Sequence, residues 1–315
     1  MGDVGNMQWP ASSEPIVASA GGRFFVETVD GDEHRFRIDD VVFEGRTAVQ
    51  HVLLVRTSQH GLMLVIDGDP QSAQADEFIY HEALVQPAML LHPNPGRVLV
   101  VGGGEGATLR EVLRHPCVET VTMIDVDREL IELSRARLGS WHQGAFDDPR
   151  TDLRIVDALQ FLHDDPGCFD VIVVDVCDYV EGTAAANLYS ADFFAHLRKA
   201  LTPNGILAIQ AGALGSAEPH GTHAQLCRLA GASFGRPTTY STYIGSFWTE
   251  WGFMLFGAIP DDAGAIPVQV IDDAIAARGL TAHLRSYDGR THRRMFNLPR
   301  HIRDGLQAND QTAFG

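Results

Sequence analysis

Residues 98–111 read Val-Leu-Val-Val-Gly-Gly-Gly-Glu-Gly-Ala-Thr-Leu-Arg-Glu. A short apolar run enters a glycine loop and a helical pattern follows, which is the strand–loop–helix order of a nucleotide-binding α/β unit. A loop that holds a pyrophosphate offers its backbone N–H groups to an anion. The carboxylate of Glu105 in this loop repels phosphates and attracts a cation. The stretch therefore favours a nucleoside that carries positive charge.

Strands and helices alternate on the C-terminal side of this loop. Apolar strands are expected at residues 98–101, 120–124, 153–156, 171–174 and 205–210, and helices at 107–115, 127–137, 158–163, 191–201 and 222–233. This alternation predicts a parallel sheet that is covered by helices on both faces. An antiparallel pair at 238–244 and 252–256 is expected to close the sheet, and one helix at 268–277 precedes an irregular tail.

A different pattern precedes the loop. Residues 22–67 alternate apolar and polar side chains, with expected strands at 24–29, 36–43, 52–55 and 62–66 and a turn at 67–70. A helix is expected over 76–92, and Pro87 should kink or divide it. The predicted organisation is a mobile tail at 1–15, a small antiparallel β domain at 16–75 and a Rossmann-like domain at 76–315, which includes the C-terminal tail.

The overall charge limits the classes of partner. The 315 residues carry a net charge of −17, which disfavours nucleic acid and anionic membranes as partners and suits a polycationic substrate, although it also serves solubility alone. No segment approaches the roughly 20 apolar residues of a membrane span. The four cysteines form no CxxC pair, which favours a cytoplasmic location. His220 and His223 lack a third ligand, so no metal site is expected.

Carboxylates follow four successive strands. Glu105, Asp125, Asp157 and the pair Asp175 and Asp178 come at the ends of strands where α/β proteins bind ligands. A single aspartate at such a place is often a helix cap or a turn former. Clustered carboxylates repel one another unless a cation joins them. Together they predict a site for a cationic nucleoside and an amine.

Several motifs in order resemble the polyamine aminopropyltransferases, the spermidine synthase family. These are the loop at 98–111, the run Asp-Glu-Phe-Ile-Tyr-His-Glu at 76–82, the pair Asp175 and Asp178, and residues 205–210, within a stretch of roughly 40–257. The resemblance implies a methyltransferase-like Rossmann domain after a small β domain, and a homodimer or homotetramer. It also implies aminopropyl transfer from decarboxylated S-adenosylmethionine to a polyamine, with release of 5′-methylthioadenosine and no prosthetic group.

The same resemblance implies which residues bind the aminopropyl donor. By position, Glu105 with Gln50 would hold the aminopropyl ammonium, and Asp125 would bind the ribose hydroxyls. Asp157, with Ala158 beside it, would bind the adenine amino group. The implied donor-binding set is Gln50, Gly102, Gly104, Glu105, Asp125, Asp157 and Ala158.

The resemblance also implies the residues on the acceptor side. Asp175 would take a proton from the attacking amine, and Asp178 would anchor the acceptor. Tyr80, Gln71 and Gln210 would line the acceptor channel. The implied substrate-binding set is Gln71, Tyr80, His81, Asp178, Gln210 and Phe247.

Two departures from the spermidine synthase pattern concern the acceptor. Phe247 stands where that pattern has a tyrosine, so a hydroxyl that would bond a short diamine is missing. Glu181 adds a carboxylate that could meet a further ammonium, and both features are closer to thermospermine synthases. A triamine such as spermidine is the favoured acceptor, and putrescine stays open. The alternatives are a methyltransferase that uses intact S-adenosylmethionine, whose carboxylate Glu105 should repel, and a non-catalytic paralogue.

Overall fold

The computed structural model describes residues 16–19, 21–29, 32–164, 167–177, 188–214 and 221–306. The chain forms two compact units, and the change from one to the other falls between Glu77 and Phe78. The expected boundaries at 15 and 75 stay predictions, and the expected tail at 1–15 lies outside the described residues. Within the described ranges every helix is too short or too polar to cross a bilayer.

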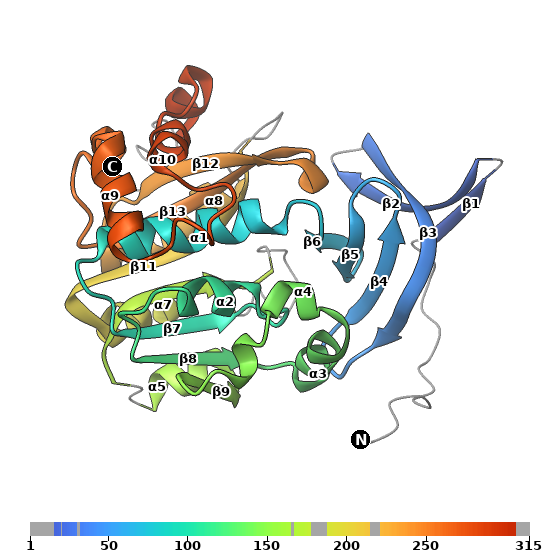
Figure 1. Ribbon diagram of the computed structural model, residues 1–315, viewed down its shortest axis with the longest axis horizontal. Coiled ribbons are helices and arrows are strands. Elements are labelled where there is room, and N and C mark those ends of the chain that lie inside the picture. The colour runs from blue at the N-terminus through green and yellow to red at the C-terminus, as the bar shows by residue number, and fades with distance from the viewer. Residues whose placement is uncertain are drawn as a thin grey trace. The chain divides into compact units, whose positions relative to one another are not determined.

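The N-terminal unit is a six-stranded antiparallel sheet in which the strands pair in sequence order (Figure 1). Its strands are β1 (Ile16–Ser19), β2 (Gly22–Val29), β3 (Asp32–Arg46), β4 (His51–Thr57), β5 (Gly61–Ile66) and β6 (Asp69–Ala73). This confirms the predicted β domain. The turn expected at 67–70 is shorter, because Asp67 and Gly68 both have positive φ and reverse the chain in two residues.

The C-terminal unit contains a seven-stranded sheet in the order β12-β13-β11-β10-β7-β8-β9 (Figure 1). The strands are β7 (Arg97–Gly102), β8 (Thr120–Asp125), β9 (Thr151–Ile155), β10 (Phe169–Asp175), β11 (Leu201–Ala213), β12 (Thr238–Ile244) and β13 (Thr249–Gly257). Neighbouring strands from β7 to β11 are parallel, and β13 runs antiparallel to both β11 and β12. The predicted Rossmann-like sheet and its closing antiparallel pair are confirmed.

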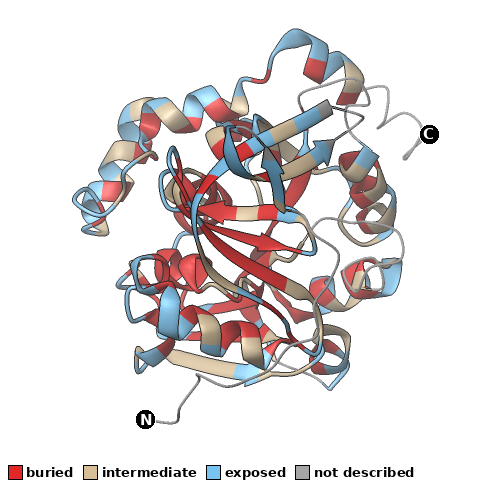
Figure 2. Ribbon diagram, turned by 90° about the vertical axis from the view of Figure 1, so that its right-hand side faces the viewer, coloured by how far each residue is buried: buried red, intermediate tan, exposed pale blue. Residues whose placement is uncertain are grey.

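Helices cover both faces of this sheet. They are α1 (Glu77–Leu91), α2 (Ala107–Leu113), α3 (Arg128–Arg137), α4 (Gly139–His142), α5 (Ala158–His163), α7 (Ala191–Ala200), α8 (Gly221–Phe234), α9 (Val268–Ala277) and α10 (Gly289–Phe296). Val98 and Val100 of β7 pack in one core with α1, α2 and α9, while Leu99 and Val101 pack in a second core with α5, α7 and α8. Buried residues accordingly concentrate in the central strands (Figure 2).

The glycine loop between β7 and α2 lies where the order of the strands reverses. From β7 the chain winds outward through β8 and β9, then returns to place β10 on the other side of β7. The backbone N–H of Gly103 donates to the carbonyl of Asp175 at 2.8 Å. A Cβ at Gly102 would lie 2.3 Å from the same carbonyl oxygen, so no larger residue fits there. The loop and the end of β10 are therefore in direct backbone contact, at the place where such sheets bind ligands.

Helix α1 continues through Pro87, so of the two outcomes expected there the division is wrong, and the kink stays a prediction. Proline has no N–H for the carbonyl four residues earlier, which here is that of Ala83. The hydroxyl of Tyr240 on β12 donates to this carbonyl at 3.0 Å. A side chain 157 residues away thus satisfies the acceptor that the proline leaves open.

The segment after α9 is more regular than expected. Helix α10 begins at an N-cap in which the Asp288 carboxylate accepts the N–H of Thr291 at 2.7 Å, and residues 300–306 are also helical. The prediction of a wholly irregular tail is therefore wrong.

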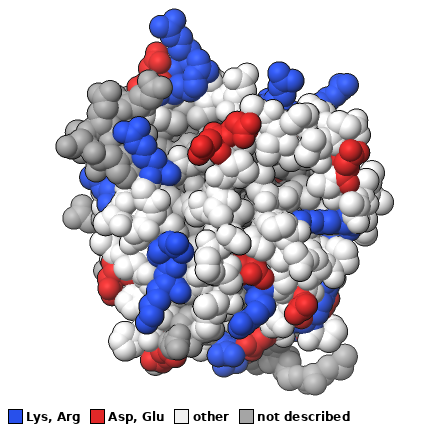
Figure 3. Space-filling model, turned by 90° about the vertical axis from the view of Figure 1, so that its left-hand side faces the viewer, with Lys and Arg blue, Asp and Glu red and all other residues white. Residues whose placement is uncertain are grey.

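Charged residues are dispersed on the face of the molecule that Figure 3 shows. Lys and Arg side chains lie at several separate places on it, some beside one another, and Asp and Glu side chains lie among them. The Lys and Arg side chains on this face thus form no single continuous basic patch.

We predict that Tyr240→Phe destabilises the protein by about 1–3 kcal/mol, because the buried carbonyl of Ala83 loses its donor. Pro87→Ala restores an N–H at that turn of α1. The loss from Tyr240→Phe should therefore be smaller in a Pro87→Ala background. Urea unfolding of the four proteins measures this coupling. Equal losses in both backgrounds would refute the role given to Tyr240.

Candidate functional site

Four acidic residues lie at the carboxyl ends of four adjacent strands. Asp125 ends β8 and Asp175 ends β10, while Glu105 follows β7 and Asp157 follows β9. These strands are neighbours in the order β10-β7-β8-β9. These four of the five predicted carboxylates therefore share one edge of the sheet, and the fifth, Asp178, lies outside the described residues.

Two hydroxyl groups hold the carboxylate of Asp175. Tyr80 on α1 donates to Oδ1 at 2.8 Å, and Thr108 on α2 donates to Oδ2 at 2.5 Å. A carboxylate offers about four lone-pair sites, so two of them stay available to a ligand. Asp175 is thus fixed in orientation by neutral groups, and its negative charge is not cancelled by either of these partners.

Asp125 lies close to the glycine loop. A Cβ at Gly104 would come within 3.1 Å of Asp125 Oδ2, so the bare backbone of the loop lets the two approach. Burial, together with the nearby charges of Asp127 and Asp175, raises the pKa of Asp125 from an ordinary value of 3.8 to about 7. The N–H of Asp127 donates to Oδ1 at 2.8 Å, which opposes that rise. Asp125 is therefore a carboxylate that changes charge near neutral pH.

The carboxylate of Glu105 contacts a buried histidine. His81 Nε2 lies 2.9 Å from Glu105 Oε1, and the two side chains are 1% and 12% exposed. His81 comes from α1, as Tyr80 does, so one helix contacts both the acid within the loop and the acid at the end of β10. This contact helps to orient the Glu105 carboxylate.

Asp157 has a structural role of its own. Its Oδ1 accepts the N–H of Gln160 at 3.0 Å, so it is the N-cap of α5, whose first residue is Ala158. The side chain is exposed, and its second oxygen is not used in this cap. The capping alternative is thus observed for Asp157, and its adenine-binding role stays a prediction.

Aromatic rings extend away from Asp175. The ring of Tyr80 lies 6.1 Å from that of Phe247, which in turn lies 4.8 Å from that of Trp251. We call Tyr80, Phe247 and Trp251 the aromatic wall. Gln210 on β11 is buried, and its amide donates to the carbonyl of Val176, just beyond Asp175, at 3.1 Å. An apolar surface with an acid at its end suits an alkyl amine.

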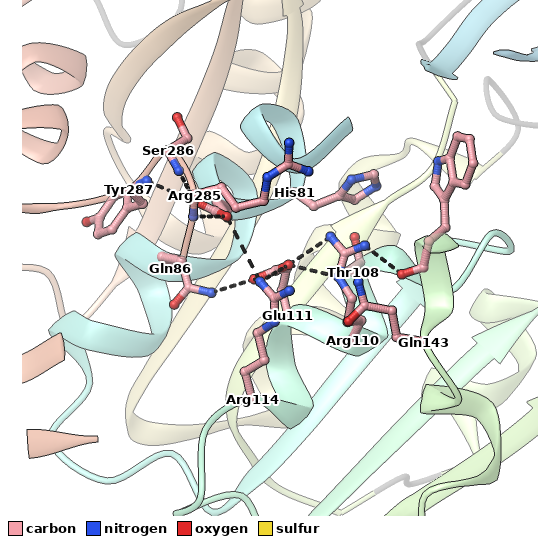
Figure 4. A network of polar contacts seen from close by, with 12 residues as sticks. His81, Gln86, Thr108, Arg110, Glu111, Arg114, Gln143, Arg285, Ser286 and Tyr287 are labelled. Atoms are coloured by element: carbon pink, nitrogen blue, oxygen red, sulfur yellow. Dashed lines mark hydrogen bonds and ion pairs between the residues drawn. The ribbon is translucent and has the colours of Figure 1, made fainter. Parts of the chain in front are cut away.

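A buried polar network connects α1 and α2 next to the site (Figure 4). Glu111 accepts from Gln86, Arg110 and Arg114 at 2.7–3.0 Å. Gln86 also contacts His115 at 2.9 Å, and burial beside Arg278 lowers the pKa of His115 to about 3. The network joins α1 to α2, the two helices that carry Tyr80 and Thr108.

Sequence reasoning missed Thr108 and Glu111. Thr108 lies within residues 98–111, four residues after Gly104. Its hydroxyl could have been recognised as a possible hydrogen-bond donor to the site. Glu111 gave no such signal, because a helical glutamate is normally exposed and solvated.

Some predicted residues cannot be placed in this site. Asp178 and Glu181 lie outside the described residues, as does His220. Gln50 and Gln71 belong to the N-terminal unit, where Gln71 donates to the carbonyl of Asp69 at 3.2 Å. Their roles toward the ligands stay predictions. His223 is buried and contacts Thr239 Oγ1 at 2.9 Å, so it is engaged inside the fold.

Two family models match the chain. The spermine/spermidine synthase domain matches residues 77–254, and the spermidine synthase tetramerisation domain matches residues 24–74. The first match covers more than half of the chain and includes all the carboxylates of the site described above.

Individual relatives agree with these matches. Polyamine aminopropyltransferase 2 of Pseudomonas aeruginosa is 43% identical over 243 residues, which are 77% of this chain and 69% of the relative. The polyamine aminopropyltransferase of Aeropyrum pernix is 36% identical over 292 residues, 92% of each chain.

Solved structures carry the same fold. A spermidine synthase in complex with the transition state analogue AdoDATO aligns with a TM-score of 0.81 and 26% identity, over 90% of this chain and 95% of that one. Spermidine synthase from Thermotoga maritima aligns with a TM-score of 0.79 and 26% identity, over 90% and 94% of the two chains. The acidic strand ends, the glycine loop and these similarities lead to one conclusion: the chain belongs to the spermine/spermidine synthase family of aminopropyltransferases.

Proposed function

We propose that this chain transfers the aminopropyl group of decarboxylated S-adenosylmethionine to an amine of a triamine such as spermidine and releases 5′-methylthioadenosine. The observation that carries the proposal is Asp175, held by the hydroxyls of Tyr80 and Thr108 beside the glycine loop. Membership of the family supports the reaction class.

The donor would bind through its positive charges and its ribose. Glu105 would receive the aminopropyl ammonium, with its carboxylate oriented by His81. Asp125 would accept from the ribose hydroxyls, while Asp157 and Ala158 would meet the adenine. Gly102 and Gly104 would allow the nucleoside to approach the backbone. Intact S-adenosylmethionine carries a carboxylate that this arrangement repels, which favours the decarboxylated donor.

The chemical step would be a direct displacement. An alkyl amine has a pKa near that of lysine, about 10, and arrives protonated. Asp175 would accept a proton from it, and the freed nitrogen lone pair would form the new bond to the aminopropyl methylene. The C–S bond breaks, and its electron pair stays on sulfur, which turns the sulfonium into the neutral thioether of methylthioadenosine. Alignment of nitrogen, carbon and sulfur would supply much of the rate.

The acceptor preference would depend on the aromatic wall. Phe247 offers an apolar ring where a tyrosine hydroxyl would bond a short diamine, so the methylene chain of a longer amine fits better there. Asp178 would anchor the acceptor and Glu181 would meet its further ammonium. Gln71 and Gln210 would line the same channel. Putrescine remains the alternative acceptor.

We further propose that the protein is cytoplasmic and assembles as a homodimer or homotetramer through its N-terminal β unit. The match of that unit to a tetramerisation domain supports an oligomer.

The decisive experiment incubates purified protein with decarboxylated S-adenosylmethionine and a panel of putrescine, cadaverine, spermidine and norspermidine. Mass spectrometry of the products should find an aminopropylated triamine and methylthioadenosine. A product from putrescine alone would replace the triamine assignment. Methylated product from intact S-adenosylmethionine would favour a methyltransferase, and binding of donor and amine without any product would favour a non-catalytic paralogue.

We predict that Asp175→Asn lowers kcat by about 10²–10⁴-fold, because the amide cannot accept the proton while its shape is unchanged. The affinity for methylthioadenosine should change little. The control is Asp170→Asn on the same strand, where the carboxylate accepts the N–H groups of Gly96 and Arg97 at 3.0 Å. It should affect stability more than kcat. Undiminished turnover in Asp175→Asn would remove this residue as the base.

The pKa of Asp125 predicts a pH dependence of donor binding. This pKa is raised to about 7, so the ionised form, which accepts hydroxyl hydrogen bonds best, dominates only above pH 7. The affinity for methylthioadenosine should rise about tenfold between pH 6 and pH 8. Calorimetric titrations measure it, and Asp125→Asn should flatten the profile and weaken binding. An equally steep profile in this variant would assign the titration to another group.

We predict that Phe247→Tyr raises the ratio of kcat/KM for putrescine over spermidine by about 3- to 10-fold, the size of one added hydrogen bond. Trp251→Phe is the control, since it alters the same aromatic wall without adding a hydroxyl. An unchanged ratio in Phe247→Tyr, or an equal change in Trp251→Phe, would contradict this account of acceptor choice.

A further inference from the structure

The carboxylate of Glu82 is bonded to a segment more than 200 residues away. It is fully buried and accepts the backbone N–H groups of Arg285, Ser286 and Tyr287, each at 2.8 Å. Figure 4 shows Arg285, Ser286 and Tyr287 of this segment beside α1. The bonded segment lies beyond residue 254, where the match to the synthase domain ends.

A buried carboxylate is costly unless its oxygens are hydrogen-bonded. Burial raises the pKa of Glu82, and the three N–H bonds act in the opposite direction. Removing the carboxylate would leave three backbone N–H groups without their acceptor, and that of Tyr287 is buried. Glu82 and residues 285–287 therefore form one unit that cannot separate at low cost.

Helix α1 needs such a unit to fix its rotation about its axis. An amphipathic helix is oriented by its apolar stripe, but every residue from 81 to 90 is buried. Burial on all sides defines the place of a helix better than its rotation. Specific polar contacts can then select one rotation of α1 among those that packing allows.

That rotation controls the candidate catalytic carboxylates. Tyr80, His81 and Glu82 are consecutive, so their side chains leave the helix about 100° apart. Tyr80 reaches Asp175 and His81 reaches Glu105, while Glu82 reaches the C-terminal segment. A rotation of α1 would displace both contacts in the site together.

Two arginines of the C-terminal segment hold α1 at its two ends. The guanidinium of Arg285 lies 3.6 Å from the ring centroid of Phe78. Arg278 donates to the carbonyls of Met89, at 2.5 Å, and His92, at 2.8 Å. We call Arg278 and residues 285–287 the C-terminal clasp.

We infer that Glu82 is a positioning residue of the transfer reaction: by binding the C-terminal clasp it sets the rotation of α1 and thereby the contacts of Tyr80 with Asp175 and of His81 with Glu105. This inference rests on the proposed function.

The test is Glu82→Gln, which keeps the shape but directs an NH₂ group at N–H donors. Because a displacement of about 1 Å can cost 10²-fold, kcat should fall about 10- to 100-fold while KM for the amine changes less than threefold. The matched control is Asp272→Asn, whose carboxylate accepts the N–H of Gly289 at 2.7 Å and links α9 to α10. Its kcat should stay within twofold of the wild type. An unchanged kcat in Glu82→Gln, or an equal loss in Asp272→Asn, would overturn the inference.

A double-mutant cycle separates positioning from a loss of stability. If Glu82 acts partly through Tyr80, then Glu82→Gln should cost several-fold less kcat in a Tyr80→Phe background than in the wild type. Fully additive losses would overturn the link. If Glu82→Gln does not fold, Ser286→Pro removes one of the three donors from the far side of the contact, and it should show the same loss and the same coupling.

The inference can also fail or hold independently of the proposed function. A wild-type protein that transfers no aminopropyl group to any amine defeats the proposed function. In that case a crystal structure of Glu82→Gln decides the inference. The Tyr80 hydroxyl should have moved out of hydrogen-bond reach of Asp175, which is 2.8 Å away in the wild type. An unmoved hydroxyl would overturn the positioning role.

Discussion

The backbone contact between the glycine loop and the end of β10 is the constraint on which the site depends. Gly103 donates to the carbonyl of Asp175, and a side chain at Gly102 would collide with that same carbonyl. Because Asp175 is both the backbone partner and the acid, the approach of the two strands also places the carboxylate beside the loop. The position of the Asp175 carboxylate is thus tied to the backbone contact between the loop and β10. A change in this contact would also move the carboxylate.

Gathering acids in this way is electrostatically unfavourable. The pKa of Asp125 is raised by burial and by the nearby charges of Asp127 and Asp175, which means that the folded protein holds this carboxylate at a cost. The hydroxyls of Tyr80 and Thr108 bond Asp175 without neutralising it. Cationic ligands would relieve the repulsion, so the unfavourable term in the ligand-free protein becomes part of the driving force for binding a charged donor and a charged amine.

Local signals in the sequence predicted most of the architecture but few of the contacts between its parts. Apolar runs and their spacing located the parallel strands, and the acids that follow them were found for the same reason. The bond between Tyr80 and Asp175 joins residues 95 apart, and no periodicity reports such a pairing. The expected division of α1 at Pro87 does not occur. The hydroxyl that satisfies the open carbonyl of Ala83 belongs to Tyr240 on a distant strand, and no local pattern indicates this contact. For Asp157 the local pattern allowed two roles, because a helix cap and a ligand-binding acid look alike in sequence.

Helix α1 explains why the distant contacts matter. This helix is buried on nearly all sides. It therefore has no single apolar stripe that would indicate, in the sequence or during folding, which side faces the core. The polar partners of α1 lie on β12, on α2 and in the segment after residue 254. The C-terminal segment falls outside the match to the synthase domain, yet it bonds the residue next to His81. The contacts that hold α1 therefore extend beyond residues 77–254, the stretch that matches the synthase domain.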